Sequence, residues 1–163
     1  MIDESSLFKE NYLVKSKENK NIASISMDKQ SYNCAASRLY YSLYLMLLFY
    51  DYKKTLWKKD VFEKCLERIK NDKIKASFEK RGWDANYIPH VFIKDLISEH
   101  VFIDDDKFRS IFRRTVDDLH GLREKADYNY IDVTKQDLTN TWEWTLNLIE
   151  ELKNKGEING TAK

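Results

Sequence analysis

Side chains that could bind or react with a phosphate group are concentrated in the nine residues 122–130, and they are Arg123, Asp127, Tyr128 and Tyr130. An arginine can hold a phosphate through two parallel hydrogen bonds, while a carboxylate and two phenols beside it supply further polar contacts. The spacing therefore predicts a phosphate or nucleotide site. It also allows a simpler interpretation, in which Arg123 pairs with Asp127 one helical turn later and both tyrosines cover the edge of the core.

A second segment, residues 35–44, places Arg38 on an apolar, tyrosine-rich helix. Together with the string Arg123-Glu-Lys-Ala126-Asp127-Tyr128 it resembles the HEPN family, small helical proteins that are often ribonucleases, nucleic-acid-associated toxins or inactive relatives of these. The likeness is to small stand-alone bacterial and archaeal members that carry Arg-x-x-Ala-Asp-Tyr in this position. It covers the chain from about residue 13 to residue 152.

The resemblance implies metal-independent cleavage of RNA, in which a 2′-hydroxyl attacks the adjacent phosphate and two motifs face each other across a homodimer. Arg123 would then stabilise the phosphorane. In ribonuclease members a histidine follows the arginine by a few residues, but here Tyr128 takes that position and Tyr130 matches a later family tyrosine. Because a tyrosine phenol has a pKa of about 10, Tyr128 is a poor replacement for histidine in proton transfer.

Two functions stay open on these residues. In the first, which the resemblance implies, the chain is a HEPN-like, RNA-directed homodimer with Arg123 and Tyr128 as catalytic residues. It acts as a metal-independent ribonuclease or as a toxin or defence component. Alternatively it is a catalytically inactive module that binds nucleotide, RNA, or a nucleotidyltransferase-type or antitoxin partner. In toxin pairs of the family such a partner can attach AMP to the motif tyrosine, and Tyr130 is the matching position. A plain helical scaffold is the third interpretation, and no cofactor is expected.

Arg38 needs a partner, because a guanidinium on an apolar helix must either reach water or meet a carboxylate. In the resembling family this arginine lies on the helix that faces the arginine-led motif. We therefore predict that Arg38 pairs with Asp127, and that the pair holds Tyr128 and Tyr130 beside Arg123. All four of these residues, with Arg123, form the predicted phosphate or nucleic-acid site.

The three histidines lie outside the arginine-led string. Arg114 and His120 have a family-like separation, but six positions along a helix leave their side chains about 120° apart. His90 and His100 are interpreted as structural or surface residues. None of the histidines has metal-ligand spacing, so no metal site is predicted.

Lysines on both sides of Trp57, in pairs 53–54 and 58–59, form a candidate edge for following the phosphates of RNA. A solvated loop is the alternative. The many tyrosines could stack on bases, but Tyr40, Tyr41 and Tyr44 recur at helical spacing, which favours a place in the core.

Composition favours one domain built from long helices. The chain has 163 residues, 42% of them hydrophobic and 34% charged, with 4 glycines and 1 proline, too few turn-forming residues for a β-sandwich or barrel. Its formal charge of +1 gives no overall attraction to nucleic acid. Cys34 and Cys65 form no CxxC pair, so buried, reduced thiols are predicted.

Apolar periodicity predicts an all-α fold of four to five main helices. The resemblance implies that these helices form an antiparallel, HEPN-like bundle. The predicted helices cover about residues 7–25, 31–52, 61–69, 91–97, 108–123 and 134–153. Thr134 and Asp137 have the spacing of a capping box at the start of the last helix. Residues 1–154 are assigned to a single domain and 155–163 to a flexible polar tail.

The chain carries no sign of membrane insertion or export. Its apolar runs fall short of the roughly 18 residues that a membrane span needs, and its first residues lack the basic and then apolar plan of a signal peptide. We expect a cytoplasmic protein with no membrane contact.

Overall fold

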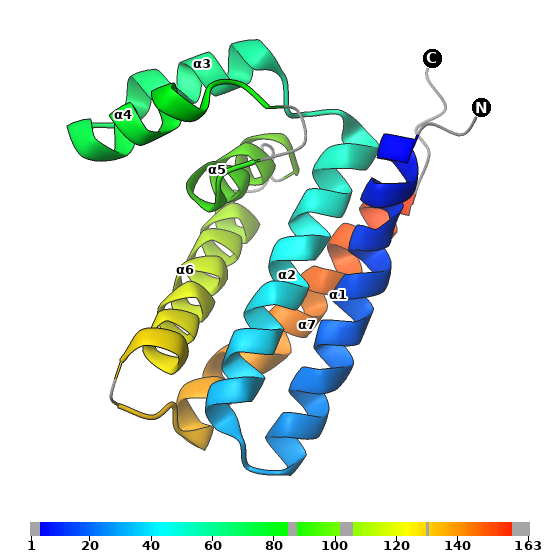
Figure 1. Cartoon of the computed structure of the whole chain (residues 1–163). Helices are drawn as coiled ribbons and strands as arrows, with labels where there is room; N and C mark the ends of the chain where they lie inside the picture. The colour runs from blue at the N-terminus through cyan, green and yellow to red at the C-terminus, as the bar shows by residue number, and fades with distance from the viewer. Residues whose placement is uncertain (1–3, 85–87, 102–105, 130, 158–163) are drawn as a thin grey trace.

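The computed structural model describes residues 4–84, 88–101, 106–129 and 131–157. These ranges contain seven helices and no strand (Figure 1), which confirms the all-α prediction for the described part of the chain. The helices are α1 (Glu4–Asp28), α2 (Tyr32–Lys54), α3 (Lys59–Arg68), α4 (Asp72–Arg81), α5 (His90–Val101), α6 (Asp106–Tyr128) and α7 (Lys135–Glu157).

Four long helices form the body of the molecule. Helices α1 and α6 run in one direction and α2 and α7 in the other (Figure 1), so the bundle is antiparallel as predicted. Helix α2 lies at its centre and contacts α1, α5, α6 and α7. None of the described helices is long and apolar enough to cross a membrane.

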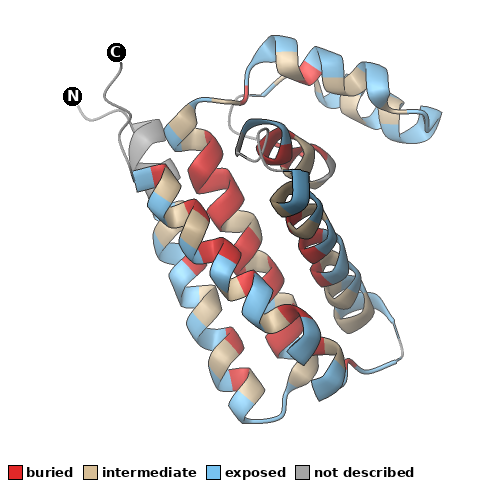
Figure 2. Cartoon of the chain, turned by 180° about the vertical axis from the view of Figure 1, so that it is seen from behind, coloured by how far each residue is buried: buried red, intermediate tan, exposed pale blue. Residues whose placement is uncertain are grey.

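Helix α2 is central because apolar side chains cover nearly its whole circumference, as its sequence predicts. Figure 2 shows the buried residues concentrated along it and on the inward faces of its neighbours. Its fully buried large side chains are Leu39, Leu43, Met46 and Leu47. Burial of each such side chain contributes roughly 1.5–3 kcal/mol, so this helix fixes the position of the others.

The start of α7 confirms the predicted capping box. The Thr134 backbone N–H donates to Asp137 Oδ2 at 2.9 Å, and the Asp137 N–H donates to Thr134 Oγ1 at 3.2 Å. These bonds and the Lys125 ammonium, 2.9 Å from Asp137 Oδ2, lower the pKa of Asp137 to about 2, with the Lys125 hydrogen bond the largest cause.

The predicted end of the last helix near Lys153 is wrong, because α7 continues to Glu157. Gly156 is buried, and a Cβ placed on it would lie 3.0 Å from Phe49 Cε1, so this last turn still packs on α2. Residues 155–157, which were assigned to the polar tail, therefore belong to α7. Residues 158–163 lie outside the described residues.

Helix α4 was not predicted, since the sequence indicated no helix between residues 69 and 91. None of its residues is fully buried, and its large apolar residues, Ile74 and Phe78, form a single i, i+4 pair. Its ends are instead fixed by local chemistry. Asn71 caps its start by accepting hydrogen bonds from two backbone N–H groups, and Gly82, at φ +72°, ends it in a conformation that other residues rarely adopt.

Helices α3 and α4 lie beyond the C-terminal end of α2 (Figure 1) and are attached to the body by aromatic rings. The Trp57 ring lies 6.0 Å from Phe62 of α3 and 5.7 Å from Trp83, and Phe78 of α4 lies 5.3 Å from Phe92 of α5. Trp57 is buried, so it is a packing residue and no platform for base stacking.

The prediction of two buried thiols is wrong. Cys34 is exposed, Cys65 is partly buried, and both are free. Cys34 lies in the first turn of α2, where the Ser26 hydroxyl donates to its sulfur at 3.3 Å. Burial raises the pKa of the Cys65 thiol.

Candidate functional site

The last turns of α6 bring Arg123 against the tyrosines of α2. Arg123 Nη2 donates to the hydroxyl oxygens of Tyr41 and Tyr128, each at 3.0 Å. Its Cζ lies 5.8 Å from the ring centroid of Tyr40, 5.6 Å from Tyr41 and 4.9 Å from Tyr128. Aromatic faces attract a guanidinium at such distances. Since the side chain is only 15% exposed, Arg123 is held in a cage of three rings.

Asp127 completes the surroundings of Arg123. Its Oδ2 lies 2.8 Å from Arg123 Nε, so the one-turn ion pair of the simpler sequence interpretation does form. The Nε–H makes no aligned hydrogen bond, which leaves the contact electrostatic. Ser37 Oγ of α2 also donates to Asp127 Oδ2 at 3.4 Å.

The predicted pair between Arg38 and Asp127 is wrong. Arg38 is exposed, and its Nη1 donates to Asn19 of α1 at 3.4 Å. The reason is the register of α2, in which adjacent residues point about 100° apart. Ser37 faces the end of α6, and Arg38 consequently points toward α1.

The structure describes one of the two tyrosines of the arginine-led motif. Tyr128 is 69% exposed and lies with its ring against the Arg123 guanidinium. Its ring therefore forms the exposed wall of the arginine cage. Tyr130 lies outside the described residues, so its place in the predicted site stays a prediction.

The structure adds two histidines to this cluster that the sequence analysis set aside. His90 Nδ1 and the Tyr40 hydroxyl are 2.6 Å apart, and the His90 ring is stacked on Tyr44 with centroids 3.7 Å apart. His120 lies 5.3 Å from the Tyr40 ring. The cluster borders a pocket of about 210 Å³, lined by Tyr40, His90, Lys94, Val116, Asp117 and His120.

The hydrogen bond between Tyr40 and His90 joins two neutral groups. Burial raises the pKa of Tyr40 to about 12, and burial together with the nearby Arg123 and His120 lowers the pKa of His90 to about 4. At neutral pH the phenol therefore keeps its proton and His90 stays uncharged. The tautomer of His90 sets the donor of this hydrogen bond, and the tautomer protonated on Nε2 accepts the Tyr40 proton at Nδ1.

His120 is on the Arg123 side of α6, away from Arg114. Arg114 pairs with Asp118 at 3.6 Å and lines a different pocket, beside Trp144 of α7. The divergence expected from their six-residue separation is confirmed. His120 and Arg123 are three residues apart, and both lie next to the Tyr40 ring. This i, i+3 spacing was the sequence signal that could have linked them.

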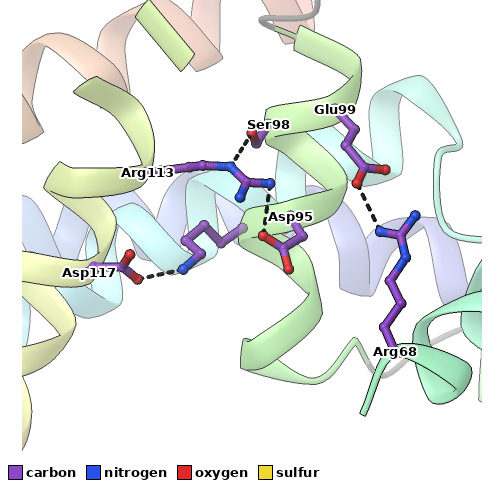
Figure 3. A network of polar contacts seen from close by, with 7 residues as sticks. Arg68, Asp95, Ser98, Glu99, Arg113 and Asp117 are labelled. Atoms are coloured by element: carbon purple, nitrogen blue, oxygen red, sulfur yellow. Dashed lines mark hydrogen bonds and ion pairs between the residues drawn. The ribbon is translucent and has the colours of Figure 1, made fainter. Parts of the chain in front are cut away.

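Ion pairs hold α5, and with it His90, against α6 (Figure 3). Lys94 Nζ lies 2.6 Å from Asp117 Oδ1, and Arg113 contacts both Asp95 at 3.1 Å and the Ser98 hydroxyl at 2.7 Å. Single exposed pairs of this kind contribute little stability. Their effect here is to set the register between the two helices that carry His90 and His120.

Within the described ranges, no three His, Cys, Asp or Glu side chains are grouped so that they could hold a metal ion. The chemistry of the cluster is that of a fixed cation, two imidazoles and three phenols. Such a set can bind a phosphate and move a proton at its edge.

Comparisons with known protein families, with curated proteins and with solved structures found no match for this chain.

Proposed function

We propose that this chain binds RNA at the Arg123 cluster and cleaves the phosphodiester without a metal ion. The observation that carries the proposal is the gathering of Arg123, His90 and His120 around the ring of Tyr40, beside a pocket. The HEPN resemblance implies the same reaction and a HEPN-like bundle. In ribonuclease members of the family, the proton-transfer histidine stands at the position of Tyr128. We assign that role to His120 in this chain.

In this mechanism the phosphate occupies the position next to Arg123, whose guanidinium exchanges the Tyr128 hydroxyl for a phosphate oxygen. His120 removes the proton of the 2′-hydroxyl, the 2′-oxygen bonds to phosphorus, and the bond to the 5′-oxygen breaks. The leaving 5′-oxygen takes a proton from water. The products are a 2′,3′-cyclic phosphate and a 5′-hydroxyl end.

His90 acts in this scheme as a donor. In the tautomer that accepts the Tyr40 proton at Nδ1, the Nε2–H of His90 can donate to a phosphate oxygen. Its low pKa keeps it neutral, so it adds no charge to the pocket. Arg123 supplies the charge that stabilises the phosphorane.

The test is cleavage of end-labelled total RNA and transfer RNA by purified protein in EDTA. His120→Asn is expected to slow cleavage by about 10²–10⁴-fold, since it removes the acid–base group, and Arg123→Ala by about 10²–10³-fold. Arg114→Ala is the matched control, an arginine of the same helix on another face, and is expected to keep full activity. Equal losses in all three variants would contradict the assigned site.

A second candidate is a catalytically silent module that uses the same face to bind RNA, a nucleotide or a nucleotidyltransferase-type partner. The observation that favours it is the ion pair of Arg123 with Asp127, a carboxylate already placed where a phosphate would bind. No cleavage by the wild-type protein, combined with RNA binding that Arg123→Ala abolishes, would select this candidate. Homodimerisation belongs to both proposals, and sedimentation of the purified protein would measure it.

A further inference from the structure

A second charged pocket lies on another part of the molecule, where the turn from α2 to α3 meets the C-terminal half of α5. Its volume is about 490 Å³. The ionised side chains on its wall are four cations and two anions, namely Lys54, Lys58, Lys64, Arg68, Asp60 and Glu99. Tyr40 and Lys54 are 14 positions apart on α2, about 21 Å along the helix axis, so this pocket is distinct from the Arg123 cluster.

The cations of this wall are only partly neutralised. Arg68 Nη1 binds Glu99 Oε1 at 2.9 Å (Figure 3), so that pair contributes no net charge. The side chains of Lys58 and Lys64 are exposed and make no ion pair or hydrogen bond with the described residues. The wall carries an excess of two positive charges, and a concave surface concentrates such a field.

The local fold directs these lysines to one place. Helix α2 ends at Thr55 in the left-handed conformation, at φ 52° and ψ 46°, and the chain turns so that Lys58 is the N-cap residue of α3. No side chain caps this helix start, so the positive end of the helix dipole adds to the charge of the lysines. Lys64 then follows on α3, toward the same pocket.

We propose that this pocket binds a phosphate group. The ligand is recognised by charge, because Trp57, the aromatic residue between the lysines, is buried and unavailable for stacking. The phosphate belongs either to the RNA backbone or to a free small anion, and both present the same group to Lys58 and Lys64. The site goes beyond the proposed cleavage site and shares no residue with it.

The experiment follows backbone amide NMR signals of the full chain during titration with inorganic pyrophosphate. We expect saturable shifts at Thr55, Lys58 and Lys64. In Lys58→Gln/Lys64→Gln the Kd for pyrophosphate should rise about tenfold or more, as losing two charge-assisted contacts implies. Lys17→Gln/Lys29→Gln on and just after α1 makes the same change in net charge elsewhere, and should keep the wild-type Kd.

A second titration with short single-stranded RNA bearing a 5′-hydroxyl identifies the source of the phosphate. If RNA shifts the same amides, the backbone is a ligand, and the Lys58→Gln/Lys64→Gln variant should lower the salt slope of RNA binding by about 1.4, at about 0.7 per contact. Shifts with pyrophosphate alone assign a free anion. No saturable shift with either probe, or equal losses in both lysine pairs, overturns the proposal. Arg123→Ala should keep the pyrophosphate shifts. Binding at this pocket can therefore be measured whether or not the chain cleaves RNA at Arg123.

Discussion

The two cationic regions of this molecule differ in how their charges are satisfied. At the Arg123 cluster the guanidinium already has two phenol hydroxyls and a carboxylate around it. At the pocket beside α3, Lys58 and Lys64 have no such partner among the described residues. The first, the organised region, is held by hydrogen bonds. The second, the unpaired region, is defined by its excess positive charge.

This difference separates two ways of attracting a phosphate. A ligand at Arg123 must replace contacts that the protein makes with itself, so its affinity depends on how well it reproduces their geometry. A ligand at Lys58 and Lys64 gains mainly Coulomb energy, which salt screens. The first arrangement favours selective binding of a reacting phosphate, and the second favours binding that is sensitive to salt and tolerant of ligand shape.

The largest effect that tests the organised region is on its stability in acid. The pKa of His90 is about 4 in the folded protein, against about 6.5 for an unfolded histidine. Between these values the unfolded chain binds more protons, so the free energy of unfolding should fall as pH drops from 6.5 to 4. The loss attributable to His90 should be on the order of 1–3 kcal/mol, measured by urea denaturation across this range.

His90→Gln is the control for this prediction, because it keeps a polar side chain that does not titrate. Subtracting its pH profile from that of the wild type isolates the histidine from the carboxylates. Identical profiles for wild type and His90→Gln would mean that the imidazole is not buried as the structure has it.

Asp127→Asn is the second test, because it removes the carboxylate partner of Arg123 and leaves this cation without an ion pair, like Lys58 and Lys64. Removing the carboxylate 2.8 Å from Arg123 Nε frees the cation for a phosphate. RNA affinity should rise about fivefold, which corresponds to about 1 kcal/mol for a partly exposed ion pair. Fluorescence anisotropy with labelled RNA at fixed salt measures the change.

Glu143→Gln supplies the matched control for the charge change, since this exposed α7 residue loses the same single negative charge away from the cluster. Its RNA affinity should stay near that of the wild type. Weaker binding in Asp127→Asn would instead show that the carboxylate orients Arg123, and the proposed competition between carboxylate and phosphate would be wrong.

Local sequence signals predicted the parts of the molecule that depend on local physics. The apolar periods of α2, α6 and α7 and the bonds between Thr134 and Asp137 follow from spacing alone. Helix α4 was missed because its large apolar residues, Ile74 and Phe78, form a single i, i+4 pair, which is too short a pattern to identify a helix.

The site was harder to predict because it depends on tertiary register. The ion pair between Arg123 and Asp127 follows from their spacing. The register of α2 does not, and it places Arg38 against Asn19 and Ser37 against Asp127. His90 lies 50 positions from Tyr40 in sequence, and only the packing of α5 against α2 brings them into contact. No spacing rule contains that information, so the sequence indicated only a structural or surface role for His90.

The smallest predicted effect concerns the stability of the unpaired region. If Lys58 and Lys64 served the fold, replacing them would destabilise it, whereas an excess of like charge in one pocket weakly opposes folding. Lys58→Gln/Lys64→Gln should therefore leave the free energy of unfolding unchanged or raise it by less than about 0.5 kcal/mol, with the gain largest at low salt. Urea denaturation at two salt concentrations checks this, with Lys17→Gln/Lys29→Gln as the comparison. A loss of about 1 kcal/mol or more would show that these lysines have structural partners, and the contrast between the two regions would not hold.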